Sequence, residues 1–158
     1  MPAVAAVAAF AAFRKLLLDT ATSPSRVPSN QGSFRPISVI APKGSIFNPA
    51  YAAVSLGLLH GSQPDVFVVC HDPTRKVILG MESFALPTVE DVIDLTIRLG
   101  SRTNPAIRCG GISLNTASFD ADSAEALMAA ERKRLGLPVS DPIRGGASFD
   151  ALVENILA

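Results

Sequence analysis

The sequence has little net charge and few cysteines, which excludes several classes of function at the outset. Its 158 residues include 14 basic and 14 acidic side chains, so the formal net charge is zero. A chain without a basic field has nothing to attract nucleic acid or an anionic membrane surface. The two cysteines, Cys70 and Cys109, form no CxxC and have no metal-type spacing. They indicate free thiols on strands in a reducing compartment, so we expect a cytoplasmic protein without a metal site.

Long hydrophobic runs are also missing. The opening "MPAVAAVAAFAAFRKLLLDT" contains a short apolar stretch, and its basic residues Arg14 and Lys15 follow that stretch rather than precede it. The stretch is too short to span a bilayer, and its charge order is wrong for a signal peptide. We therefore expect no membrane partner. Residues 1–36 are interpreted as an Ala-rich helix followed by a flexible linker rich in Ser, Pro, Asn and Gly.

From residue 37 onward, short apolar runs alternate with stretches of helical character. The apolar runs predict strands at residues 37–40, 66–70, 106–114 and 137–139. The intervening stretches predict helices at residues 49–61, 88–100, within 118–138, and at 148–158. Such alternation is typical of βαβ units, so we expect an α/β domain with a three-layer arrangement: a parallel sheet with helices on both faces.

Capping residues define where these helices should begin and end. Asn48 is expected to be the N-cap of the first helix, and Gly61 to stop it. Thr88, followed by acidic residues, predicts the start of the second helix, which Gly100 closes. Gly136 should end the third helix.

Polar clusters follow three of the predicted strands, at the ends where open α/β sheets bind their ligands. These clusters are His71-Asp72, Asn115-Thr116 and Asp141-Pro142. The other histidine, His60, comes before its strand and should lie at the opposite edge of the sheet. We expect it to interact with the dipole of a helix C-terminus rather than to join a site with His71.

His71 and Asp72 are the candidate catalytic residues, as an acid–base pair or as metal ligands. The alternative is a turn, because Asp before Pro commonly caps one. The amide of Asn115 can both donate and accept, which suits the reading of a base or carboxamide edge, although it could equally cap the next turn. A Ser-His-Asp triad stays open, but the sequence has no GxSxG elbow.

A phosphate-binding loop is absent from the sequence. No GxxxxGK[ST] occurs, and Pro42-Lys43-Gly44-Ser45 has the wrong glycine spacing. Its proline also removes a backbone N–H that a phosphate cradle would use.

Three stretches resemble the C-terminal domain of the D-glutamate N-acetyltransferase-like family. They are "GSIFNPAYAAVSLGLLHGSQPDVFVVCHDPTR", "LGSRTNPAIRCGGISLNT" and "LGLPVSDPIRGG", and the resemblance runs from about Lys43 to Ala158. It implies a P-loop NTPase-type fold similar to dethiobiotin synthetase over residues 37–158. It also implies acetyl transfer from acetyl-CoA to the amino group of D-glutamate or a related small amino acid.

By the same resemblance, Asn115, Thr116, Asp141 and Pro142 match positions where relatives read a base, so acetyl-CoA or a nucleotide is the expected ligand. The chain departs from the family where Ala41-Pro42-Lys43-Gly44 replaces an acidic Glu-Gly-Gln-Gly segment. The missing phosphate loop and the unmatched first 42 residues imply a truncated chain with impaired transfer. The alternatives are a non-catalytic nucleotide- or CoA-binding half-domain, or a metal-assisted hydrolase using His71 and Asp72. An incomplete sheet would also leave a free strand edge, through which homo-oligomers can form.

Overall fold

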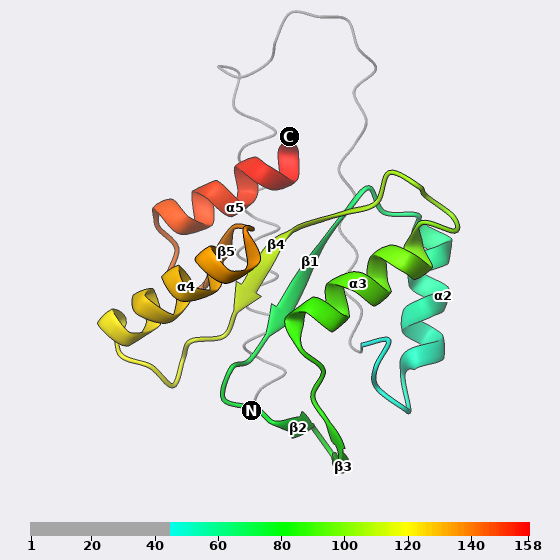
Figure 1. Cartoon of the computed structure of the whole chain (residues 1–158), viewed down its shortest axis with the longest axis horizontal. Coiled ribbons are helices and arrows are strands. Elements are labelled where there is room, and N and C mark those ends of the chain that lie inside the picture. The colour runs from blue at the N-terminus through cyan, green and yellow to red at the C-terminus, as the bar shows by residue number, and fades with distance from the viewer. Residues whose placement is uncertain (1–44) are drawn as a thin grey trace, which may run out of the picture.

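The protein is described here by a computed structural model that covers residues 45–158 (Figure 1). The segment expected at residues 1–36 and the strand expected at 37–40 lie outside the described residues. In chain order the elements are α2 (Ala52–Ser62), β1 (Val66–His71), β2 (Val77–Ile78), β3 (Met81–Ala85), α3 (Val89–Gly100), β4 (Arg108–Leu114), α4 (Ala121–Leu135), β5 (Val139–Ser140) and α5 (Ala147–Leu157).

The main sheet has the strand order β1-β4-β5, and both pairings are parallel. Val66 pairs with Arg108 at the start of β1, and His71 pairs with Leu114 at its end. Since the strands also follow one another in the chain, α3 and α4 are the helices of two successive crossovers. The α/β class with a parallel sheet is thus confirmed.

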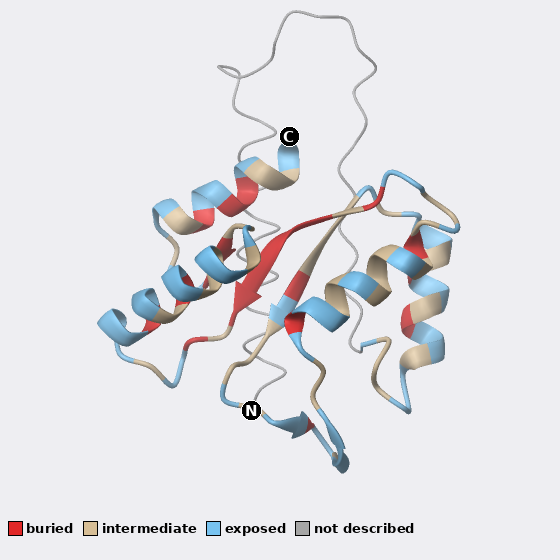
Figure 2. Cartoon of the chain, in the orientation of Figure 1, coloured by how far each residue is buried: buried red, intermediate tan, exposed pale blue. Residues whose placement is uncertain are grey.

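Helices cover both faces of this sheet, which confirms the three-layer arrangement (Figure 1). On one face, α3 and α4 pack over a cluster of buried side chains: Val69, Val89, Cys109, Ile112, Leu114, Met128 and Val139. On the other face, α5 contributes Phe149, Leu152 and Val153. Figure 2 shows β4 buried along almost its whole length, as expected for a central strand covered on both sides.

Strand β4 contains an irregularity at its two glycines. Phe67 pairs with Cys109, but Val68 pairs with Gly111, so Gly110 is an extra residue in β4. A side chain at Gly111, where φ is +141°, would lie 2.4 Å from Leu152 Cδ1. The glycine pair therefore lets α5 approach the backbone of β4 directly.

Helix α2 begins later than its sequence suggests. Asn48 does not cap it: the Asn48 Oδ1 atom accepts from the N–H of Ala50 at 2.9 Å, which makes a local turn. The helix starts at Ala52, with Tyr51 as N-cap. The expected stop at Gly61 is also wrong, since Gln63, with φ of +48°, ends the helix by donating its N–H to Leu59 O.

The other helix ends agree with the capping analysis. Thr88 and Asp91 form a reciprocal capping box at the start of α3, and the helix ends at Gly100. Asp120 caps α4, and Gly136 ends it in the left-handed conformation. The strand boundaries differ more, because β4 begins at Arg108 instead of residue 106 and β5 spans Val139–Ser140 instead of 137–139.

A small antiparallel hairpin, β2–β3, lies between β1 and α3, in a segment where the sequence patterns predict no strand. Leu79 and Gly80 connect its two strands, with Gly80 at φ +77°. The hairpin projects from the domain near the carboxyl ends of the main strands (Figure 1). Within residues 45–158, no helix is both long enough and apolar enough to cross a membrane.

Candidate functional site

The polar clusters predicted at the strand ends do meet at one edge of the sheet. The N–H of Asn115 donates to the carbonyl oxygen of His71 at 2.9 Å, which ties the end of β4 to the end of β1. Thr116 reaches in the other direction to Asp141, which follows β5. The three strand ends are therefore joined by hydrogen bonds between their clusters.

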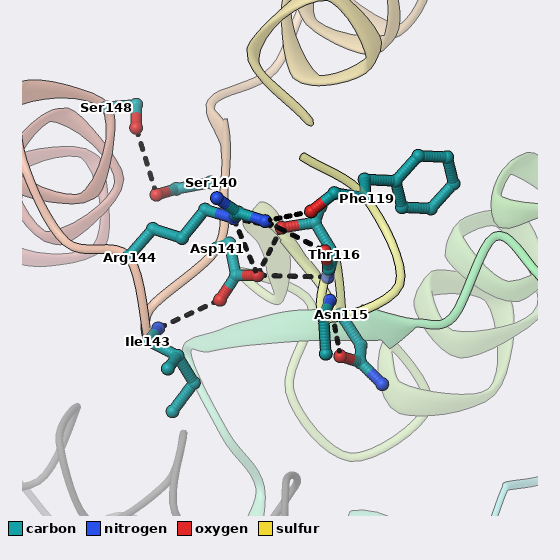
Figure 3. A network of polar contacts seen from close by, with 9 residues as sticks. Asn115, Thr116, Phe119, Ser140, Asp141, Ile143, Arg144 and Ser148 are labelled. Atoms are coloured by element: carbon teal, nitrogen blue, oxygen red, sulfur yellow. Dashed lines mark hydrogen bonds and ion pairs between the residues drawn. The ribbon is translucent and has the colours of Figure 1, made fainter. Parts of the chain in front are cut away.

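Thr116 and Asp141 form the buried centre of this edge (Figure 3). The Asp141 Oδ2 atom accepts from the N–H of Thr116 at 2.9 Å and from its hydroxyl at 2.5 Å. The other oxygen, Oδ1, accepts from the N–H of Ile143 at 2.9 Å. Thr116 is 0% and Asp141 4% exposed, and Pro142 is also buried, so none of the three offers open surface to a ligand.

Arg144 completes the network, and the sequence analysis did not identify it. Its Nε atom donates to the Thr116 hydroxyl at 2.7 Å. Its Nη2 atom donates to the carbonyl oxygens of Thr116, at 3.0 Å, and Phe119, at 2.6 Å (Figure 3). One guanidinium thus fixes the loop after β4 against the loop after β5. The only sequence signal was its position three residues after Asp141 in a glycine-bounded loop.

Asn115 is the member of the four expected cofactor-binding residues that keeps open surface. Its Nδ2 donates to Asp72 Oδ2 at 3.2 Å, and its Oδ1 accepts from the N–H of Ala117 at 3.2 Å. A carboxamide has two donor hydrogens and two acceptor lone pairs. One donor and one acceptor of Asn115 thus remain, which fits the recognition of an amide or a base edge.

The carboxylate of Asp72 is occupied by its neighbours. Oδ1 accepts from the N–H of Thr74 at 3.1 Å and from its hydroxyl at 2.7 Å. Oδ2 contacts Asn115 and, at 3.3 Å, the Nε of Arg75. Burial alone would raise the pKa of Asp72, but the bonds from Thr74 and the charge of Arg75 together lower it. Asp72 is therefore an ionised loop-organising residue, as in the turn interpretation, and it is not hydrogen-bonded to His71.

His71 is half-buried, and its imidazole has no hydrogen-bond partner among residues 45–158. Burial lowers its pKa, and the charge of Arg134 adds to this, against a smaller opposing influence from Asp72. The ring is thus neutral near pH 7 and able to accept a proton. Of the six predicted site residues, His71 lines the cleft that lies at the end of β1.

That cleft has a volume of about 230 Å³ and lies between the end of β1, the start of α3 and the second half of α4. Its lining combines apolar and charged side chains: His71, Pro73, Thr88, Val89, Glu90, Leu114, Leu127, Glu131 and Arg134. Arg134 contacts Glu131 on its own helix and Glu90 on α3. Asn115 follows the lining residue Leu114, so the cleft adjoins the strand-end network.

His60 belongs to neither feature. Its Nε2 atom lies 2.9 Å from the carbonyl oxygen of Leu99, near the C-terminus of α3. The His71 cleft adjoins the N-terminus of that same helix, so the two histidines are separated by about 15 Å of helix. This confirms that they do not form one site. No grouping of metal-binding side chains is found among the residues that the structure describes.

Comparison with known proteins agrees with this architecture. The model of a family described as "Domain of unknown function (DUF1611_C) P-loop domain" matches residues 27–153, so the match begins before Lys43, where the sequence resemblance was expected to start. The chain therefore belongs to the DUF1611 C-terminal P-loop domain family. A crystal structure of a DUF1611 family protein from Anabaena variabilis superposes with a TM-score of 0.66 at 28% identity, covering 73% of this chain and 33% of that one.

Two curated relatives carry a functional name. A D-glutamate N-acetyltransferase of Pseudoalteromonas is 39% identical over 118 residues, or 75% of this chain and 35% of its own length. A D-glutamate N-acetyltransferase of Tritonibacter scottomollicae is 37% identical over 116 residues, or 72% of this chain and 35% of its own length. The chain thus spans about a third of the length of these relatives.

Proposed function

We propose that this domain serves the transfer of an acetyl group from acetyl-CoA to the amino group of D-glutamate or a related small amino acid. The two curated relatives with that name support the reaction class. The observation in this structure that carries the proposal is the joining of the His71, Asn115 and Asp141 strand ends at one edge. Such an edge is where open α/β sheets bind their ligands.

In this proposal the residues have different roles. Asn115 contacts the ligand, with one donor and one acceptor still available. Thr116, Asp141 and Pro142 are buried, so they act by holding the loop of Asn115 in place. The fit is to the amide or base portion of acetyl-CoA or of a nucleotide, because the sequence contains no GxxxxGK[ST] loop for phosphates. Acetyl-CoA would supply the activated acetyl group as a thioester.

The test is acetyl transfer by the purified full chain with acetyl-CoA and D-glutamate, followed by mass spectrometry of the amino acid. We expect N-acetyl-D-glutamate to form, slowly if phosphate contacts limit the affinity for the donor. Asn115→Ala should raise the half-saturating concentration of acetyl-CoA about 10-fold, the loss of one to two hydrogen bonds to the ligand. Arg98→Ala, on the exposed side of α3, is the matched control. Absence of product with several D-amino acids would refute the transfer.

A second candidate is a non-catalytic half-domain that binds CoA or a nucleotide. The absence of a phosphate loop from the sequence favours it. Isothermal titration with CoA and with ATP separates the two candidates, because a binding half-domain takes up one of these ligands without turning over acetyl-CoA. The same samples can be examined by sedimentation for a homo-oligomer, which the edge of β1 would allow because β1 pairs only with β4 among residues 45–158.

A further inference from the structure

The cleft beside His71 is lined by titratable side chains, and Asn115, Thr116, Asp141 and Arg144 of the strand-end network are not among its lining residues. We propose that it is the acceptor-amine site: a small primary amine enters it as an ammonium ion and loses its proton to His71. This inference rests on the proposed acyl transfer for its reaction, but the binding it describes can be measured without turnover.

The charges of the cleft favour a cation. Glu90 and Glu131 contribute two negative charges, Arg134 contributes one positive charge, and His71 is neutral, which leaves a net charge of −1. Arg134 is already paired with both glutamates. A carboxylate of a ligand would therefore meet an excess of negative charge in the cleft, whereas the ammonium group of a ligand would restore neutrality.

The shape and floor of the cleft favour a small aliphatic ligand. Its volume of about 230 Å³ is below the range of drug-sized pockets, which begins at about 300 Å³. Val89, Leu114 and Leu127 provide an apolar surface against which methylene groups can pack. The ligand class is thus a short carbon chain with an amino group at the end that enters the cleft.

His71 has the properties that a base at this place requires. Its ring lines the cleft, and it has no hydrogen-bond partner among residues 45–158. The surrounding charged groups are Asp72 on its own loop, Glu90 on α3, and Glu131 and Arg134 on α4. Burial of the ring outweighs the charge of Asp72, so the pKa of His71 stays lowered and Asp72 does not hold the imidazole in the protonated form.

The position of the cleft suits transfer from a donor held at Asn115. The backbone hydrogen bond from the N–H of Asn115 to the carbonyl oxygen of His71 fixes the two strand ends side by side. The amine nitrogen attacks the thioester carbonyl carbon, the new C–N bond forms, and the C–S bond breaks with departure of the thiolate. The ammonium gives up two protons in total: one passes through His71 to solvent, and the other ends on the thiolate sulfur.

The chain offers a direct test because it contains only two histidines. We would follow the ring resonances of His71 and His60 by NMR in the full chain, with His60 as the internal control. The probes are n-butylamine, D-glutamate, and glutarate, which lacks the amine. Butylamine and D-glutamate should both shift the His71 signals, and butylamine, which is a cation, should also lower its apparent pKa, because a bound cation disfavours a second positive charge. Glutarate should leave both histidines unchanged.

Variants on α4 provide a matched pair. Glu131 and Glu125 are each paired with an arginine of the same helix, but only Glu131 lines the cleft. Glu131→Gln should weaken butylamine binding about 10-fold, the loss of one charge-assisted hydrogen bond, while Glu125→Gln should have no effect. In the transfer assay, His71→Gln should lower kcat about 100-fold or more with little change in KM for acetyl-CoA.

The outcomes distinguish this inference from the proposed function. If the amines shift His71 but no acetyl transfer occurs, the amine site stands and the transfer is refuted. If transfer occurs while His71 responds to none of the amines, or while His71→Gln retains full kcat, the acceptor site lies elsewhere. A His71 response to glutarate equal to that for D-glutamate would overturn the ammonium orientation.

Discussion

Thr116 and Asp141 are 25 residues apart in the chain, yet the hydroxyl of Thr116 donates to the Asp141 carboxylate at 2.5 Å in the interior of the domain. Their backbones follow β4 and β5, so this contact fixes the ends of two neighbouring strands. Three donors converge on the two oxygens of one buried carboxylate, so an NH₂ group in place of either oxygen would leave at least one donor without an acceptor.

Asp141→Asn should destabilise the domain by about 2–4 kcal/mol, because an amide NH₂ would face donors that need an acceptor. Urea unfolding followed by circular dichroism measures this loss. Asp94→Asn is the control, since the Asp94–Arg98 pair is exposed and its removal should cost less than about 1 kcal/mol. Equal stability of the two variants would show that the carboxylate is not needed at residue 141.

Arg144→Lys should loosen the loop after β4, because a lysine cannot span the Thr116 hydroxyl and the Phe119 carbonyl that one guanidinium now bridges. We expect chymotrypsin to cut after Phe119 several times faster than in the parent chain. Electrophoresis with mass analysis of the fragments gives the rates. Arg98→Lys, at an exposed helix position, should leave the cleavage rate unchanged.

Gly111→Ala should be strongly destabilising. The new methyl group would lie 2.4 Å from Leu152 Cδ1 and 2.5 Å from the carbonyl oxygen of Pro138, at a φ of +141°. We expect a loss of at least about 3 kcal/mol from strain and overpacking.

Gly57→Ala is the matched control for this glycine. Gly57 lies inside α2, and a Cβ added there would have no atom of another segment of residues 45–158 within 4 Å. Alanine there should stabilise the domain by up to about 1 kcal/mol, since it favours helix. Thermal unfolding measures both variants: the melting temperature should fall for Gly111→Ala and rise for Gly57→Ala if α5 packs on β4 as described.

The stability contributed by Asp72 should depend on pH. Its pKa is lowered in the folded state, so the stabilisation is fully present above the unfolded value of 3.8 and is lost as pH falls through the folded pKa. Asp72→Asn should therefore be less stable than the parent chain at pH 7. The difference should shrink towards zero as pH falls well below 3.8. Urea midpoints at a series of pH values test this, and a constant difference would contradict the assignment.

Sequence patterns predicted the main sheet well because its strands carry strong signals. The run Val66–Cys70 is continuous and apolar, and Thr88 and Gly136 are residues with strong capping preferences. The sequence did not predict the hairpin β2–β3, because Leu79-Gly80 is a weak turn signal compared with Asn-Gly. The prediction of Asn48 as a helix N-cap was wrong because an asparagine side chain caps a turn as readily as a helix.

The candidate site was predictable in position but not in division of roles. Strand ends alone placed His71, Asn115 and Asp141 at one edge. That Asp141 is buried, and that Arg144 bridges to it, depends on tertiary packing that no local pattern contains. The cleft beside His71 also requires α4 to supply Glu131 from a segment 60 residues later, which only the folded arrangement reveals.

The unpaired Gly110 divides β4 into two parts, each with its own register against β1. The register with β1 shifts between Phe67 and Val68, but the pairing is regular from Gly111 to Leu114. A shift at the entry to the strand can thus be absorbed at the bulge before it reaches Asn115. The candidate site at the strand ends should therefore be unaffected by length changes in the loop before Arg108, and insertions there are the ones that the fold should tolerate best.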